Sequence, residues 1–137
     1  MNVRLTKEQK IKILNAKDVF SIMRQILMRE NKIGRAKEHF WVVGLNNGNR
    51  ILFIELISLG SATSTIVNPP EVFRLAIYKL ATQIILVHNH PSGNMKVSKN
   101  DTKLTETLKI AGSILGIPVL DHLIISEDDY ISVMKKS

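Results

Sequence analysis

The stretch QIILVHNHPSGNMKVSKND, residues 83–101, contains the signals that decide the fold. The run QIILVH is too short for a helix and too apolar for an exposed strand, so it predicts a central strand of a sheet. Pro-Ser-Gly at residues 91–93 predicts a turn. Ser98 and Asp101 have the spacing of a capping box, which predicts that a helix begins after Ser98.

Similar patterns predict the elements before this stretch. Residues 15–30 place apolar side chains at helical spacing and predict an amphipathic helix. Residues 39–59 predict two strands joined at Asn47-Gly48, a dipeptide that favours the positive φ angles of a type I′ turn. Residues 69–82 predict a helix that starts on two prolines. Its expected buried face comprises Val72, Leu75, Ala76 and Leu80.

The elements after the stretch complete the expected topology. Residues 98–116 predict a helix, residues 119–126 a strand, and residues 130–133 a last short strand. The order α-β-β-α-β-α-β-β predicts an α/β fold, a three-layer-like sandwich in which helices flank a mixed central β-sheet.

The composition excludes several classes of protein. A chain of 137 residues can bury a core without disulfides or a structural metal, so a bound metal would be functional. The absence of cysteine excludes thiolate zinc clusters, cysteine nucleophiles and deaminases that bind zinc through a cysteine pair. The sequence lacks both an apolar run of about 20 residues and a signal-peptide core. We therefore expect a soluble, cytoplasmic protein without a membrane partner.

The positive charge is concentrated near the N-terminus. Residues 1–37 contain ten Lys or Arg against three Asp or Glu, whereas residues 38–137 contain nine of each. Such a segment can contact nucleic acid, and it is equally explained by a solvated helix face, because Phe20 is its only aromatic residue. We expect one compact domain, with a basic segment at residues 1–35 and the main domain at residues 36–137.

His88 and His90 are candidate metal ligands. Because side chains alternate along a strand, both imidazoles should lie on one side of residues 83–88. Asp101 is expected in the first turn of the next helix, at the edge of the sheet where α/β proteins often bind ligands. Two histidines and one carboxylate leave a fourth position for water, which is typical of catalytic zinc. We expect one Zn²⁺ per chain, although Fe²⁺, Mn²⁺ and Co²⁺ suit the same ligands.

The motif resembles that of a known family. His-Asn-His-Pro-Ser-Gly followed by Ser-x-x-Asp looks like the JAMM (JAB/MPN+) metal-dependent hydrolases, and the later LDHLIIS looks like the RadC branch in particular. The resemblance covers residues 36–133 and implies a JAB/MPN fold of cytidine-deaminase-like architecture. It also implies zinc binding by His88, His90 and Asp101, a catalytic glutamate at Glu38, and an oxyanion-stabilising hydroxyl at Ser98.

Other polar residues are either alternatives to this set or have a structural explanation. Glu38 could accept a proton from a metal-activated water, and Glu55 is the rival base because it interrupts an apolar strand. An edge-strand charge that prevents sheet stacking explains Glu55 equally well. His122 and its neighbour Asp121 should face opposite ways, and we expect a structural hydrogen bond from His122. His39 should be a surface residue.

The chain departs from the RadC pattern at three places. Val97 stands where a proline usually precedes the motif serine, and Pro70 stands where an arginine is usual in Asn68-Pro-Pro-Glu71. Longer family members also carry an N-terminal helix-hairpin-helix module that residues 1–35 of this sequence do not provide.

Two classes of function follow from the sequence. The first is a zinc-dependent metallopeptidase or isopeptidase that uses Glu38 as the general base. The alternative is a DNA-associated, repair-related protein with a nuclease or non-catalytic role, which would bind nucleic acid through residues 1–37. The sequence identifies neither the peptide or isopeptide substrate nor the oligomeric state.

Overall fold

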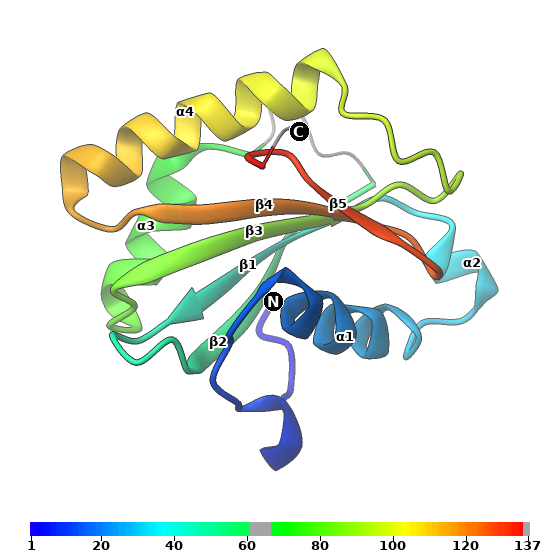
Figure 1. The fold of residues 1–137 in the computed structure, drawn as a ribbon, viewed down its shortest axis with the longest axis horizontal. Coiled ribbons are helices and arrows are strands. Elements are labelled where there is room, and N and C mark those ends of the chain that lie inside the picture. The colour runs from blue at the N-terminus through cyan, green and yellow to red at the C-terminus, as the bar shows by residue number, and fades with distance from the viewer. Residues whose placement is uncertain (61–66, 136–137) are drawn as a thin grey trace.

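The fold is described from a computed structural model for residues 1–60 and 67–135 (Figure 1). Its elements are η1 (Lys7–Gln9), α1 (Ala16–Leu27), α2 (Lys32–Arg35), β1 (His39–Leu45), β2 (Ile51–Leu59), α3 (Pro69–Tyr78), β3 (Gln83–Asn89), α4 (Lys99–Leu115), β4 (Val119–Ile125) and β5 (Tyr130–Ser132). This order confirms the expected topology and adds two short helical segments, η1 and α2.

The five strands form one mixed sheet in the order β2-β1-β3-β4-β5. β3 runs parallel to β4, and the other neighbouring strands are antiparallel. β3 is therefore the central strand, as predicted, and six of its seven residues are buried. His88 lies near its carboxyl end, and His90 directly follows the strand.

Helices cover both faces of this sheet (Figure 1). On one face, Met23 and Leu27 of α1 belong to the same apolar cluster as Trp41 of β1. On the other face, Leu104 and Leu108 of α4 belong to a second cluster, which also contains residues of α3. The two clusters confirm the expected sandwich, because alternate residues of the strands enter opposite faces.

The N-terminal residues contribute to the packing of the sheet. α1 begins after Asn15, whose side chain accepts a hydrogen bond from the Asp18 N–H. The buried residues of α1 lie at helical spacing, as expected for an amphipathic helix: Val19, Ile22, Met23, Ile26 and Leu27. Before α1, Ile13 is buried in the same cluster, and the Val3 N–H donates to the Ile54 carbonyl at 2.8 Å.

The turn between β1 and β2 differs from the expected type. Neither Asn47 nor Gly48 has a positive φ; that conformation falls on Asn49, at 61°. The Asn49 N–H donates to the Asn46 carbonyl at 2.9 Å, and the Asn46 side chain accepts from Gly48 N–H at 2.9 Å. The type I′ prediction was wrong because the Asn46 side chain stabilises a longer turn with a left-handed third residue.

α3 is shorter than the sequence pattern indicated. It begins on the two prolines as expected but ends at Tyr78, and Leu80 adopts a positive φ of 63°. Leu80 is consequently exposed, whereas Phe73 joins the buried face. Among the helices of residues 1–60 and 67–135, none has the length and apolar character needed to cross a membrane.

Candidate metal centre

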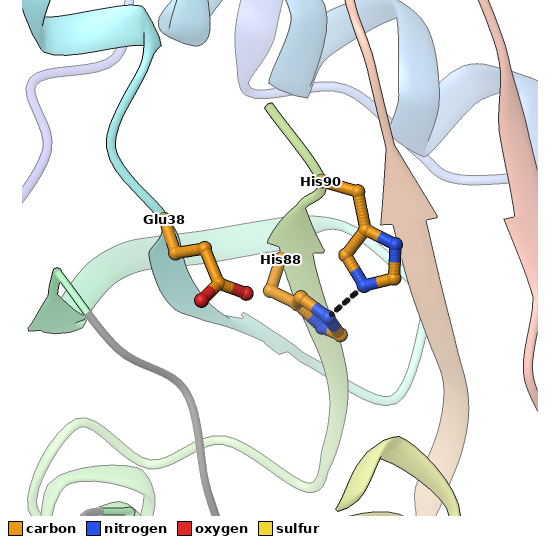
Figure 2. Close-up of side chains that lie close together, drawn as sticks. All are labelled: Glu38, His88 and His90. Carbon is orange, nitrogen blue, oxygen red and sulfur yellow. Dashed lines mark hydrogen bonds between the residues drawn. The ribbon is translucent and has the colours of Figure 1, made fainter. Parts of the chain in front are cut away.

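The end of β3 directs two imidazoles to one point. His88 and His90 lie two residues apart, and their Nε2 atoms are 3.0 Å from each other. Figure 2 shows both rings side by side, with the dashed line joining them. His88 is buried and His90 is partly exposed, so the pair lies at the boundary between the core and solvent. The expected convergence of the two side chains is therefore present.

The start of α4 brings a carboxylate to the same point. Asp101 is only 3% exposed, and its two oxygens lie 3.0 Å from His88 Nε2 and 3.5 Å from His90 Nε2. The capping box fixes this position, because the Ser98 N–H donates to Asp101 Oδ2 at 2.8 Å and the Asp101 N–H donates to Ser98 Oγ at 3.0 Å. Asp101 thus takes part in the capping box of α4 and completes the cluster.

Glu38 approaches from the segment that precedes β1. β1 pairs with β3 in an antiparallel register in which Phe40 lies opposite His88. This register brings the residue before His39 close to His90, and one ligand atom each of Glu38, His88 and His90 lies within 4.8 Å of the others. In Figure 2 the Glu38 side chain extends toward the two imidazoles. The family resemblance implied a catalytic role for Glu38, and the structure brings this glutamate close to the two histidines.

The hydrogen bond on the side of each ring that faces away from the cluster determines which ring nitrogen carries the proton. His90 Nδ1 lies 2.8 Å from the Asn94 carbonyl. A carbonyl can only accept, so the proton of neutral His90 resides on Nδ1, and Nε2 presents its lone pair to the cluster. This arrangement is common behind metal-binding histidines.

A buried series of three hydrogen bonds likewise places the proton of His88 on Nδ1, away from the cluster. The Thr105 hydroxyl donates to the Asp101 carbonyl at 2.7 Å, so its oxygen accepts from His122 Nδ1 at 2.6 Å. His122 is fully buried, and this burial lowers its pKa well below the usual range, so it is neutral. Its Nε2 therefore accepts from His88 Nδ1 at 2.8 Å, which leaves His88 Nε2 free to coordinate.

The cluster favours a positive charge at its centre. Burial raises the pKa of the Asp101 carboxyl, but contacts with His88 and His90 and the Ser98 N–H outweigh this effect and hold its pKa well below the usual range. The side-chain hydrogen bond with Asp101 is the main cause that raises the pKa of His90. Lone pairs of three side chains thus converge where either a proton or a cation must lie between them.

The separations within the cluster fit a metal ion. A tetrahedral ion with bonds of about 2.0–2.1 Å has ligand atoms roughly 3.3 Å apart. The contacts among His88 Nε2, His90 Nε2 and the Asp101 oxygens measure 3.0, 3.0 and 3.5 Å. One ligand atom each of Glu38, His88 and His90 lies within 4.8 Å of the others, so Glu38 is a further carboxylate near the same point.

The remaining polar residues have structural partners. Glu55 lies on the edge strand β2, where it is paired with the Met1 amino group at 2.5 Å and with Lys79 at 3.8 Å. His122 makes the expected structural hydrogen bond, although its partner, His88, was not anticipated. The surface prediction for His39 was wrong, because its ring stacks on Trp41 and is 2% exposed.

Sequence reasoning missed two further residues at this end of the sheet. The sequence analysis assigns no role to Thr105 or to Asn89, which lies between the two histidines of the motif. The side chain of Asn89 is buried and hydrogen-bonds to the residues on either side of Glu38. The letters of the motif contained no signal for this contact, because the partners are about 50 residues apart.

The mixed sheet, its helical layers and this cluster define a JAB-type α/β domain, and comparison with known proteins assigns the family. Residues 13–137 match the family model described as RadC-like JAB domain. A UPF0758 protein of Caldanaerobacter subterraneus subsp. tengcongensis is 46% identical over 131 residues, which cover 96% of this chain and 54% of the relative. The chain belongs to the RadC-like JAB domain family.

Other relatives carry the same type of name. A UPF0758 protein of Chlorobaculum parvum is 42% identical over 130 residues, covering 95% of this chain and 56% of the relative. One from Methanosarcina barkeri is 42% identical over 127 residues, covering 93% of this chain and 53% of the relative. The chain therefore spans about half the length of the curated relatives it matches.

Proposed function

We propose that this chain is a zinc-dependent hydrolase, a metallopeptidase or isopeptidase, that cleaves an amide bond with a metal-activated water. The observation that carries the proposal is the convergence of His88 Nε2, His90 Nε2 and the Asp101 carboxylate at 3.0–3.5 Å. A second carboxylate, that of Glu38, lies beside them. Membership of the RadC-like JAB family supports hydrolytic chemistry at this position.

The proposed ligands are His88, His90 and Asp101. When bound, Zn²⁺ would polarise the substrate carbonyl and lower the pKa of water to near 7. Asp101 is assigned as a ligand because its oxygens directly contact both Nε2 atoms. Glu38 is the other carboxylate near the two histidines, with a ligand atom within 4.8 Å of theirs. Two imidazoles and one carboxylate suit Zn²⁺, and they also suit Fe²⁺, Mn²⁺ and Co²⁺.

Glu38 is the proposed general base. Its carboxylate is close enough to the two histidines to hydrogen-bond a water lodged beside them. Glu38 accepts a proton as this water attacks the carbonyl carbon, and it returns the proton to the leaving amine as the C–N bond breaks. Glu55 does not share this position, because its partners are Met1 and Lys79 at the sheet edge.

Ser98 is the proposed hydrogen-bond donor to the developing oxyanion. Its oxygen accepts the Asp101 N–H at 3.0 Å, and a hydroxyl that accepts one hydrogen bond retains its own proton to donate. The residue is exposed, so a substrate can reach it. One such donor typically contributes about 3 kcal/mol to transition-state stabilisation.

An amide substrate is favoured over a phosphodiester. Phosphodiester cleavage commonly uses two metal ions about 4 Å apart. Within residues 1–60 and 67–135, the potential metal ligands gather around one position only. This number of ligands is sufficient for the one-metal chemistry of zinc peptidases.

A chelator-sensitive substrate screen tests the proposed function. The purified protein should hydrolyse members of a peptide or isopeptide library, lose this activity in a chelator and regain it with Zn²⁺. Single-stranded DNA should remain intact under the same conditions. Chelator-sensitive cleavage of DNA without cleavage of any peptide or isopeptide would contradict the assignment of the substrate class.

A further inference from the structure

We propose that Asn89 is a positioning residue that holds the catalytic base Glu38 in register with the two histidines. This inference rests on the proposed function, because it assigns a role to the residue between His88 and His90. Asn89 would touch neither substrate nor metal. It would act through the main chain on both sides of Glu38.

The side chain of Asn89 hydrogen-bonds to both residues that flank Glu38. Its Oδ1 accepts the His39 N–H at 2.6 Å, and its Nδ2 donates to the Lys37 carbonyl at 3.0 Å. These two groups belong to the peptide bonds that immediately precede and follow Glu38. Their positions determine the direction in which the Glu38 side chain leaves the main chain.

This contact occurs where strand pairing ends. The paired residues of β1 and β3 extend only to Phe40 and His88. One residue beyond this pair, the Asn89 side chain provides the link to the main chain of the first strand. On the other side, the Gly60 N–H donates to the Glu38 carbonyl at 2.7 Å, so the base is held from two directions.

The alternation of side chains along the strand explains why Asn89 can contact the segment around Glu38 while its two neighbours face the metal cluster. His88 and His90 face the metal cluster, so the residue between them faces the opposite side of the strand. Asn89 is 1% exposed there, and its amide supplies one acceptor and one donor at the same distance from the main chain. Aspartate has no donor for Lys37, and alanine has neither group.

A small displacement of Glu38 would affect the reaction strongly. A shift of about 1 Å in a reacting group can reduce the rate by about 10²-fold, because the proton must be accepted at hydrogen-bond distance. Removing Asn89 would also leave the His39 N–H without this acceptor, whereas the Lys37 carbonyl would keep its contact with His39 Nδ1 at 2.9 Å. The His39 N–H would then favour other positions in which it reaches water.

Asn89→Ala, Asn89→Asp and the control Asn46→Ala test the proposal. Asn46 is a suitable control because its side chain also accepts main-chain N–H groups, at the opposite end of β1. We expect Asn89→Ala to lower kcat by about 10- to 100-fold with little change in KM or zinc content. Asn89→Asp should have an intermediate effect because it keeps the acceptor for His39. Asn46→Ala should leave kcat unchanged.

Two further measurements separate positioning from general structural support. Amide hydrogen exchange of the purified, zinc-loaded protein should show faster exchange at His39 in Asn89→Ala, by about tenfold, and not in Asn46→Ala. In a Glu38→Gln background, Asn89→Ala should produce no further loss of the residual rate, because the base on which it acts is already absent.

The outcomes distinguish this inference from the proposed function. If Asn89→Ala retains the wild-type kcat, or if His39 exchange is unchanged, Asn89 does not position Glu38. An additional large loss in the Glu38→Gln background would also overturn the inference. If Glu38→Gln itself is fully active, the assignment of the base fails first, and the exchange measurement still decides whether Asn89 holds this segment.

Discussion

His122 Nδ1 lies 2.6 Å from the Thr105 hydroxyl, and this contact places the proton of His88 on Nδ1, away from the candidate metal position. The hydroxyl is itself directed to the Asp101 carbonyl at 2.7 Å. The chain of hydrogen bonds therefore starts and ends on residues of the same cluster. These hydrogen bonds link α4, β4 and β3 behind the proposed ligands.

Thr105→Val tests this chain, because valine keeps the shape and removes the hydroxyl. His122 would lose the acceptor for its Nδ1 proton, and His88 would lose its fixed orientation. We expect zinc affinity, measured by competition with a chromogenic chelator, to fall by about tenfold or more. Thr107→Val is the matched control, since its exposed hydroxyl bonds to Lys103 on the same helix. Equal affinities for all three proteins would contradict the role of the chain.

Ser98→Ala separates helix capping from catalysis. The variant should retain zinc, lose about 1 kcal/mol of the free energy of unfolding, and lose about 10²-fold in kcat. Asn68→Ala removes the corresponding cap of α3, where the Asn68 side chain accepts the Glu71 N–H at 2.9 Å. It should cost similar stability without affecting kcat. If Ser98→Ala loses stability but keeps the wild-type kcat, this serine acts only as a helix cap.

Gly44→Ala tests the close packing between β1 and β2. A Cβ at this position would overlap the Phe53 ring, which lies against Gly44. We expect urea unfolding to show a loss of about 1–3 kcal/mol. Gly48→Ala in the exposed turn should cost much less, because the nearest atom to its added Cβ is 3.5 Å away. A Gly44→Ala variant with the wild-type free energy of unfolding would contradict the close packing of β1 against β2 at this point.

The basic N-terminal residues give a prediction for nucleic-acid binding. Deleting residues 1–15 is unsuitable as a test, because Ile13 belongs to the core. Glutamine should instead replace four exposed lysines: Lys7, Lys10, Lys12 and Lys17. Binding to single-stranded DNA should weaken with salt, and the substituted protein should show a shallower salt dependence.

A control with equal charge change completes this experiment. It replaces four exposed lysines from other parts of the chain: Lys99, Lys103, Lys109 and Lys135. We expect this control to bind DNA more tightly than the N-terminal variant. Equal weakening of both would show that net charge, and no particular surface, attracts DNA. Binding that is insensitive to salt would contradict an electrostatic contact.

Local patterns were sufficient to predict most of the fold. The apolar spacing of α1, the capping box of α4 and the short apolar run of β3 are each encoded by residues close in sequence. The hairpin was also predictable, but its turn was not, because the decisive acceptor is the Asn46 side chain. The end of α3 was missed because periodicity continued to Leu80 after the helix had stopped.

The candidate site was predictable to the extent that its motif is contiguous. His88, His90 and Asp101 lie within one strand, one loop and one helix start, so strand alternation and capping already imply their convergence. Their supports come from distant parts of the chain. His122 is 34 residues from His88, and Asn89 is 50 residues from His39. Such pairs depend on strand register, which the sequence pattern did not determine.

Metal content per chain is the measurement that tests the central claim most directly. Wild-type protein and Glu38→Gln should each contain about one zinc, because Glu38 is the base and not a required ligand. The double variant His88→Ala, His90→Ala should contain none while remaining folded. Zinc retained by the double histidine variant, or absent from the wild-type protein after zinc loading, would contradict the proposed metal centre.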